Sequence, residues 1–251
     1  MLTSSRSIEG KLSNARRIFK EEIELIFVDA PNVLVRPTLP YDPFSDVETM
    51  PSPDEQPRTY WPFSSNYGFP DMKELDAALY YMRSILDKVG PVDGVFGFSM
   101  GGATAGFLAA VLERPWLHPA FAFPPSDPSA VWPIPPLQFV VACAGYVPRD
   151  ERCKKYFDPP LSTPSLHIIG KGDVVAGQDD MLALVDGFSS STVIWHEGGH
   201  WIPRQASFNL FLRNFMLAQM SPQNSPTTSP SVKPERQLIE HPLHTINLAK
   251  L

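Results

Sequence analysis

The chain has few cysteines, no basic stretch and no long apolar run, and each shortage excludes a class of protein. Cys143 and Cys153 are its only cysteines, which favours a reducing intracellular compartment over a disulfide framework. The 21 lysines and arginines are scattered among 27 acidic residues, which argues against nucleic-acid binding. No apolar run approaches the roughly 18 residues of a membrane span. The polar residues 1–11 lack the apolar core of a signal peptide.

The sequence also lacks the motifs of metal-binding and phosphate-binding sites. No group of histidine, cysteine and carboxylate residues has metal-ligand spacing, and the glycine-rich residues 97–102 lack the Gly-Lys-Ser/Thr ending of a phosphate loop. We therefore expect no metal and no cofactor.

Proline, by contrast, is abundant, with 28 residues gathered mainly in two stretches, 31–70 and 115–136. Structureless loops this long are unusual in a compact domain unless they are functional. Their aromatic side chains could wall an apolar substrate pocket or could simply pack the loops onto the body. These aromatic residues are Tyr41, Phe44, Tyr60, Trp61, Phe63, Tyr67, Trp116, Phe121, Phe123 and Trp132.

Between the proline-rich stretches, apolar runs alternate with helical patterns. Strands are expected at residues 24–30, 92–98, 139–144, 166–169 and 192–195, and helices at 71–89, 103–112, 178–188 and 203–220. The helix at 71–89 begins with a capping box formed by Asp71 and Glu74, and Gly90 ends it. This order predicts an α/β fold with a mostly parallel sheet and helices on both faces.

The chain length suits one such domain over residues 1–220. Residues 221–234 are rich in serine, proline and threonine, so we expect 221–251 to form a flexible tail.

Residues 97–102 read Gly-Phe-Ser-Met-Gly-Gly and lie between a predicted strand and a predicted helix. This pattern is typical of the nucleophile elbow of α/β-hydrolases, which holds a serine in a strained turn above the sheet edge. Side chains two positions before and after Ser99 are expected to clash, so that Gly97 and Gly101 must be glycine. The Met100 N–H, at the start of the helix, is expected to face a developing oxyanion.

A serine nucleophile needs a base and a carboxylate that orients it, in the chain order serine, acid, histidine. Asp173 follows the strand at 166–169, and His200 follows the last strand, so both suit these roles. His196 competes with His200. Asp179 and Asp180 compete with Asp173 for the role of the acid, although they suit a helix start. The alternative for Asp173 is a purely turn-forming role.

With these motifs the chain resembles the FSH-type family of small fungal serine hydrolases. The matching segments are residues 27–31 (Phe-Val-Asp-Ala-Pro), 97–102, 170–175 and 198–203. The resemblance implies an α/β-hydrolase fold, with Ser99 as nucleophile, Asp173 as acid and His200 as base. It also implies hydrolysis of a carboxylic ester or acyl thioester in polyketide or fatty-acid-derived metabolism.

Two departures from the family pattern bear on activity. Met100 replaces a common glutamine, but the oxyanion needs only its backbone N–H. Family members also begin with a strand ending in Leu-His-Gly, whose loop supplies a second oxyanion N–H, and here that strand is expected to be missing. Loss of one donor typically costs about 10²–10³ in rate. Either residues 2–5 supply the N–H, or activity is weakened. The alternatives are a non-catalytic scaffold or accessory binding protein, and acyl transfer to an alcohol or amine.

The last three residues, Ala249, Lys250 and Leu251, vary the Ser-Lys-Leu peroxisomal address. They predict binding to the peroxisomal import receptor, with a cytoplasmic location as the alternative. Peroxisomes process acyl thioesters, and fungal toxin pathways use peroxisomal enzymes, which suggests host-selective toxin biosynthesis as the setting.

Overall fold

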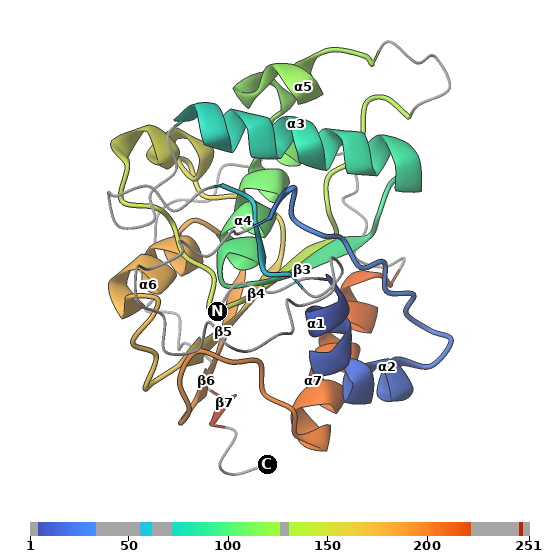
Figure 1. Cartoon of the computed structure of the whole chain (residues 1–251), viewed down its shortest axis with the longest axis vertical. Coiled ribbons are helices and arrows are strands. Elements are labelled where there is room, and N and C mark those ends of the chain that lie inside the picture. Colours follow the sequence, from blue (N-terminus) through green and yellow to red (C-terminus); the bar gives the residue numbers. More distant parts are fainter. Residues whose placement is uncertain (1–4, 34–55, 62–71, 126–130, 222–245, 248–251) are drawn as a thin grey trace, which may run out of the picture.

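A computed structural model describes residues 5–33, 56–61, 72–125, 131–221 and 246–247. Its centre is a five-stranded sheet in the order β3-β4-β5-β6-β7, in which every neighbouring pair is parallel (Figure 1). The strands are β3 (Gly94–Phe98), β4 (Phe139–Cys143), β5 (Ser165–Gly170), β6 (Ser191–His196) and β7 (Ile246–Asn247). A separate antiparallel pair joins β1 (Asn32–Val33) to β2 (Arg58–Thr59).

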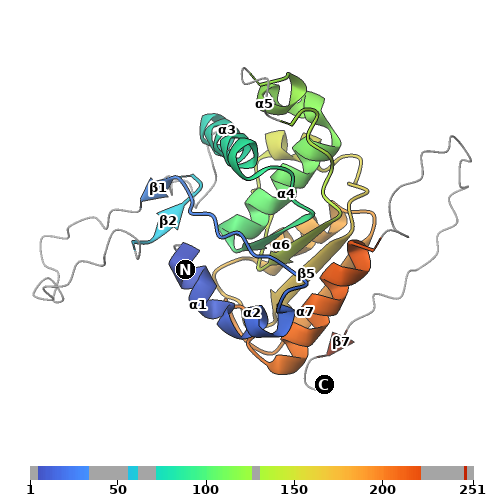
Figure 2. The ribbon, with the colours of Figure 1, turned by 90° about the vertical axis from the view of Figure 1, so that its right-hand side faces the viewer.

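Helices cover both faces of the sheet (Figure 2). The helices α3 (Met72–Val89), α4 (Met100–Glu113) and α6 (Gln178–Asp186) lie on one face. The helices α1 (Ser5–Lys11), α2 (Ser13–Phe19) and α7 (Ala206–Gln219) lie on the other. Between β3 and β4 the chain forms η1 (Pro115–Leu117) and α5 (Pro119–Ala122), and η2 (Glu151–Tyr156) precedes β5.

The pleat of β4 divides the core between these two layers. Val140 and Ala142 pack in the cluster that contains α3 and α4, whereas Phe139, Val141 and Cys143 pack in the cluster that contains α2 and α7. Successive side chains of a strand point to opposite faces, so a strand covered on both sides is apolar at every position. This is why the strand expected at 139–144 could be read from a continuous apolar run, and the α/β class is confirmed.

The helix expected at 71–89 appears as α3, and Gly90 ends it with a φ of 84°, a conformation that glycine adopts without strain. Of the capping box, Glu74 lies in the first turn, and Asp71 is outside the described residues. On the apolar face of α3, the side chains of Leu75, Leu79 and Leu86 are buried.

The strand expected at residues 24–30 is wrong. This segment has no regular secondary structure, although Leu25 and Phe27 pack against the core. A strand needs a hydrogen-bonding neighbour, and in the described part of the chain no strand lies on the side of β3 opposite β4. An apolar pattern indicates burial of a segment but not the presence of its partner.

Most of the expected tail, 222–245 and 248–251, lies outside the described residues, including Ala249, Lys250 and Leu251. The exception is β7, whose Ile246 and Asn247 pair with Ile194 and Trp195 of β6. No helix in the described ranges is both long and apolar enough to cross a membrane. The same ranges contain no cluster of three or more His, Cys, Asp or Glu residues suited to a metal ion.

Candidate active site

Ser99 occupies a sharp turn between β3 and α4. Its φ of 57° and ψ of −121° are strained for a residue with a side chain, and they raise the hydroxyl above the carboxyl end of the sheet. The Ser99 N–H donates to the Cys143 carbonyl at 2.8 Å, which ties the turn to β4. The elbow expected from the sequence is therefore present.

The glycines around Ser99 differ in how much space each leaves for a side chain. A Cβ on Gly97 would lie 2.1 Å from the Gly101 carbonyl oxygen, so this position requires glycine. A Cβ on Gly101 would meet nothing within 4 Å, so the expected clash at Gly101 is wrong. The second steric requirement instead falls on Gly102, where a Cβ would approach the Gly145 Cα to 2.7 Å.

The structure brings Ser99, His200 and Asp173 together. The Ser99 hydroxyl lies 2.9 Å from His200 Nε2, and Asp173 Oδ2 lies 2.7 Å from His200 Nδ1. Both partner side chains are shielded, with exposed fractions of 6% for His200 and 0% for Asp173. A proton can therefore pass from the hydroxyl to an imidazole whose other nitrogen is held by a carboxylate.

Asp173 follows β5 and has an environment that favours its ionised form. Its Oδ1 accepts the N–H groups of Val175 at 2.9 Å and Ala176 at 3.0 Å. Burial, the largest influence, disfavours the charge, but the Ala176 N–H, the His200 ring and the Val175 N–H outweigh it. The pKa of Asp173 therefore lies below its usual value.

Glycines let the loop that carries Asp173 meet the loop that carries His200. The Gly172 N–H donates to the Gly198 carbonyl at 2.9 Å, and a Cβ on Gly170 would lie 2.4 Å from the Gly199 carbonyl oxygen. A Cβ on Gly198 would lie 1.9 Å from the Trp201 ring. The Gly198 and Gly199 pair positions His200 because the two loops and the indole approach so closely.

The rival residues lie elsewhere or face other groups. His196 accepts the Gly198 N–H at 3.2 Å, and its pKa is lowered, chiefly by burial. Asp179 and Asp180 lie in the first turn of α6, and Asp180 pairs with Arg149 at 2.6 Å.

Of the four further histidines of the sequence, the two that the structure describes are not part of this arrangement. His118 precedes α5 and His167 lies within β5. Of the tail histidines, His241 and His244 are outside the described residues.

Met100 starts α4, where the backbone N–H groups of the first turn have no partner within the helix. Its side chain is buried, and its Sδ lies 3.0 Å from the Thr59 hydroxyl of β2. The hydroxyl of Thr59 also contacts the Trp61 carbonyl. The Met100 side chain thus anchors the elbow to β2.

Three exposed apolar residues that sequence reasoning missed lie next to Asp173 or His200 in the chain. Val174, Val175 and Trp201 are 96%, 64% and 54% exposed, and they directly follow Asp173 or His200 in the chain. An exposed apolar rim beside a polar site is typical of a surface that contacts a ligand. Their place next to the two expected site residues was the signal available in the sequence.

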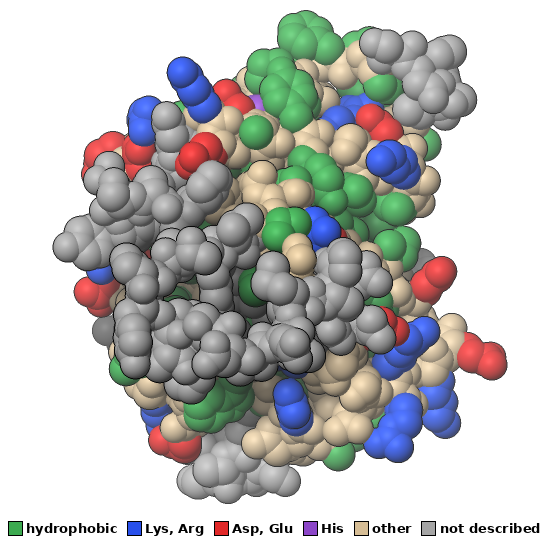
Figure 3. Space-filling view, viewed as in Figure 1, with side chains coloured by type: hydrophobic (Ala, Val, Ile, Leu, Met, Phe, Trp, Pro, Cys, Tyr) green, Lys and Arg blue, Asp and Glu red, His purple; other side chains and the backbone are tan. Residues whose placement is uncertain are grey.

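The described aromatic residues of the proline-rich stretches differ in burial. Trp61 and Phe121 are buried in the core and simply pack their loops onto the body. Trp116 and Phe123 are exposed near α5, where Figure 3 shows hydrophobic side chains gathered at one end of the molecule. Tyr41, Phe44, Phe63 and Tyr67 lie outside the described residues.

Known proteins are similar to this chain in sequence and in fold. A family model described as serine hydrolase (FSH1) matches residues 1–211. Esterase OVCA2 of Homo sapiens is 30% identical over 212 residues, which cover 81% of this chain and 86% of that protein. Esterase OVCA2 of Danio rerio is 25% identical over 224 residues, covering 85% and 91%.

Two solved structures show the same α/β-hydrolase fold. Arabidopsis thaliana SOBER1 superposes with a TM-score of 0.53 at 16% identity, covering 87% of this chain and 95% of that one. Bacillus cereus carboxylesterase gives 0.50 at 13% identity, covering 84% and 82%.

Proposed function

This chain belongs to the serine hydrolase (FSH1) family, and on that premise we propose that it cleaves a carboxylic ester or acyl thioester with Ser99, His200 and Asp173. One observation carries the proposal. His200 bridges the Ser99 hydroxyl and the Asp173 carboxylate through its two ring nitrogens, at 2.9 and 2.7 Å. The esterase activity named for the OVCA2 relatives agrees with it.

Acylation follows from this geometry. His200 Nε2 takes the hydroxyl proton as Ser99 Oγ attacks the substrate carbonyl, and the oxygen of the tetrahedral intermediate accepts the Met100 N–H. Asp173 Oδ2 holds the Nδ1 proton of His200, which fixes the tautomer, and stabilises the imidazolium. His200 then donates its proton to the departing alcohol or thiol, and the acyl group remains on Ser99.

Deacylation reuses the same groups. His200 removes a proton from a water molecule, which attacks the acyl carbonyl and forms a second tetrahedral intermediate. Its collapse releases the carboxylic acid and returns the proton from His200 to Ser99.

The exposed apolar residues next to Asp173 and His200 favour a substrate with an apolar acyl group, which the enzyme would bind through that group. Val174, Val175 and Trp201 offer exposed apolar surface beside Asp173 and His200. Burial of apolar area contributes about 25 cal/mol per Å², so an acyl chain gains affinity here with each methylene that it covers. We expect the specificity constant to rise from acetyl to medium-length acyl esters.

Hydrolysis of p-nitrophenyl esters and acyl-CoA thioesters of graded chain length tests the proposal. We expect turnover by the full chain and a loss of about 10³-fold or more in Ser99→Ala, because the nucleophile is gone. A folded chain with no turnover of either class would instead indicate an accessory binding protein. Added alcohol or amine that diverts the product from acid to ester or amide would indicate acyl transfer.

We also propose the setting that the sequence suggests, in which Ala249, Lys250 and Leu251 direct the enzyme to peroxisomes to act in secondary-metabolite biosynthesis. Support comes from these residue types alone. A fluorescent fusion that keeps these three residues at its carboxyl terminus should enter peroxisomes, and one that lacks them should stay in the cytoplasm. A cytoplasmic signal from both would contradict peroxisomal import.

A further inference from the structure

The indole of Trp201 lies against the two glycines that precede His200. Atoms Cζ2, Cε2 and Cη2 of its six-membered ring would lie 1.9, 2.4 and 2.8 Å from a Cβ on Gly198. Atoms Cζ3 and Cε3 of the same ring would lie 3.1 and 3.6 Å from a Cβ on Gly199. One ring therefore covers the backbone of both glycines.

This contact explains why residue 198 is a glycine. The three atoms nearest to a Cβ at this position all belong to the Trp201 ring. Among the described residues, Gly90 is the one glycine with a positive φ, so the backbone conformation of Gly198 does not itself require glycine. At Gly199 a Cβ would also lie 3.2 Å from the Gly172 carbonyl oxygen. The requirement at Gly198 thus comes from the indole.

The covered turn joins the loop of His200 to the loop of Asp173. The Gly198 carbonyl accepts the Gly172 N–H at 2.9 Å, and the Gly199 carbonyl accepts the Trp201 N–H at 3.0 Å. Glycine has more backbone freedom than any other residue, so two in succession form a flexible support for a catalytic base. A group that restricts this turn also restricts the position of the His200 imidazole.

Trp201 can restrict the turn because its own backbone is held in place. The next two residues, Ile202 and Pro203, are buried. The Trp201 carbonyl accepts a hydrogen bond from the Cys143 thiol of β4 at 3.8 Å. The side chain nevertheless stays 54% exposed, so the indole lies on the turn rather than in the core.

We propose that Trp201 is a positioning residue whose indole restricts the turn at Gly198 and Gly199 and so keeps His200 in reach of both Ser99 and Asp173. This inference rests on the proposed function, in which His200 is the base. A displacement of about 1 Å can lower the rate about 10²-fold. Without the ring, the turn gains freedom, and His200 spends less time at 2.9 Å from the Ser99 hydroxyl.

Ester hydrolysis by Trp201→Ala and Trp201→Phe distinguishes positioning from a substrate contact. With p-nitrophenyl acetate and p-nitrophenyl decanoate, we expect Trp201→Ala to lower kcat by a similar factor of about 10–100 on both esters. KM for the acetate should stay within about threefold, because the lost contact is with the turn. Trp201→Phe should restore most of kcat, since a smaller ring can still cover the glycines. An effect confined to KM that grows with acyl length would overturn the proposal.

A double-mutant cycle tests the contact between the ring and Gly198. Gly198→Ala alone should lower kcat about 10²-fold, because its methyl group displaces the ring or the turn. In the Trp201→Ala background the same substitution should change kcat by less than about threefold, since its methyl group has no ring to meet. Gly199→Ala is the matched control, and its effect should persist without the ring because of the Gly172 carbonyl. Additive effects of Gly198→Ala and Trp201→Ala would contradict the proposed contact.

Folding and the proposed function are measured separately from this inference. Urea unfolding gives the folded fraction of each variant, and rates are expressed per folded molecule. Trp201→Leu, which keeps an apolar side chain but no ring, gives the same comparison if Trp201→Ala does not fold. Turnover by the wild type with an unchanged rate in these variants would refute the role of Trp201 alone. A folded wild type without turnover or fluorophosphonate label would refute the proposed function, and this inference with it.

Discussion

Asp173 uses its two carboxylate oxygens for different contacts. Oδ1 accepts the N–H groups of Val175 and Ala176 and shapes the loop after β5, whereas Oδ2 holds the His200 ring. The turn-forming role and the catalytic role considered for this residue are therefore compatible. A substitution of Asp173 can distinguish its catalytic role from its turn-forming role only if the hydrogen bonds to the Val175 and Ala176 N–H groups are kept.

Asp173→Asn is designed to keep the loop contact and change the chemistry. The amide oxygen can still accept the Val175 N–H, but an amide stabilises neither the required tautomer nor the imidazolium of His200. We expect kcat to fall by about 10³–10⁴ with a small change in stability. Steady-state ester hydrolysis and urea unfolding measure the two effects, and Asp179→Asn on α6 is the control. A mutant with near wild-type kcat would contradict the assigned role of Asp173.

The glycines at the elbow give a matched pair of substitutions. Gly97→Ala places a methyl group 2.1 Å from the Gly101 carbonyl oxygen, whereas Gly101→Ala meets open space. We expect Gly97→Ala to lose about 1–3 kcal/mol or more of unfolding free energy. Gly101→Ala should be neutral or slightly stabilising, because alanine favours the helix. Equal losses in the two variants, measured by urea unfolding, would contradict the elbow geometry.

His167 makes the stability of the fold depend on pH. It lies buried in β5, with Nε2 2.9 Å from the Ser165 hydroxyl, and burial lowers its pKa from 6.5 to about 3. The unfolded chain therefore binds a proton that the folded chain rejects, and stability falls as the pH drops below about 6.5. From pH 7 to pH 5 the expected loss is about 2 kcal/mol.

Urea unfolding at these two pH values, in the wild type and in His167→Gln, isolates this contribution. The variant should lose less stability on acidification. His118 and His196, whose pKa values are also lowered, account for part of the remaining slope. Equal slopes in the two proteins would show that His167 is protonated in the fold.

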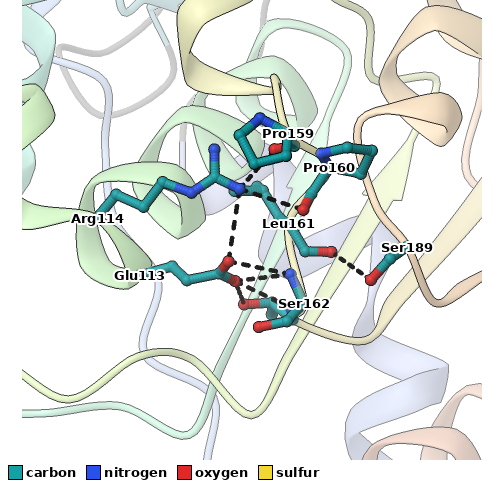
Figure 4. A network of polar contacts seen from close by, with 8 residues as sticks. Glu113, Arg114, Pro159, Pro160, Leu161, Ser162 and Ser189 are labelled. Atoms are coloured by element: carbon teal, nitrogen blue, oxygen red, sulfur yellow. Dashed lines mark hydrogen bonds and ion pairs between the residues drawn. The ribbon is translucent and has the colours of Figure 1, made fainter. Parts of the chain in front are cut away.

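At the scale of the element, α4 links the site to the connection between β4 and β5. Its first turn carries the elbow, and Glu113 at its other end accepts the N–H groups of Ser162 and Thr163 at 2.9 and 3.1 Å (Figure 4). The next residue, Arg114, donates to the carbonyls of Pro159 and Pro160. The segment before β5 is thus held by the end of α4, about 20 Å from Ser99 along the helix.

Glu113→Ala removes the acceptor and leaves two N–H groups without a protein partner. We expect a loss of about 2 kcal/mol of unfolding free energy, because hydrogen bonds to a charged group contribute about 1.5–3 kcal/mol. Activity per folded molecule should stay within about twofold. Glu151→Ala, which removes an exposed pair with Lys154, should change stability by less than about 0.5 kcal/mol. Urea unfolding distinguishes the two, and an equal effect would contradict the anchoring role of Glu113.

The elements differ in how well the sequence could predict them. The inner strands and the helices α3, α4, α6 and α7 were predicted because each is long or apolar enough to show its period. The helices α1 and α2 were missed, since they have seven residues each and a polar composition. Residues 24–30 showed a strand pattern, but a strand also depends on a partner that no local pattern contains.

At the scale of the whole molecule, parallel strands bring distant residues to one edge. Ser99 follows β3, Asp173 follows β5 and His200 follows β6, and the carboxyl ends of these strands lie together. This topological rule made the three residues predictable from their order alone. The clash geometry of Gly102, the exposed rim and the contact of the Trp201 ring with Gly198 depend on three-dimensional packing, so no sequence pattern indicated them.

The measurement that tests the central claim most directly is labelling with a fluorophosphonate probe followed by peptide mass mapping. It is made on the full chain, on His200→Ala and on His196→Ala. Our account predicts one labelled residue, Ser99, with the rate of labelling reduced by about 10²-fold or more in His200→Ala and nearly unchanged in His196→Ala. Label on another residue, or loss of label in His196→Ala alone, would contradict the assignment of Ser99 and His200.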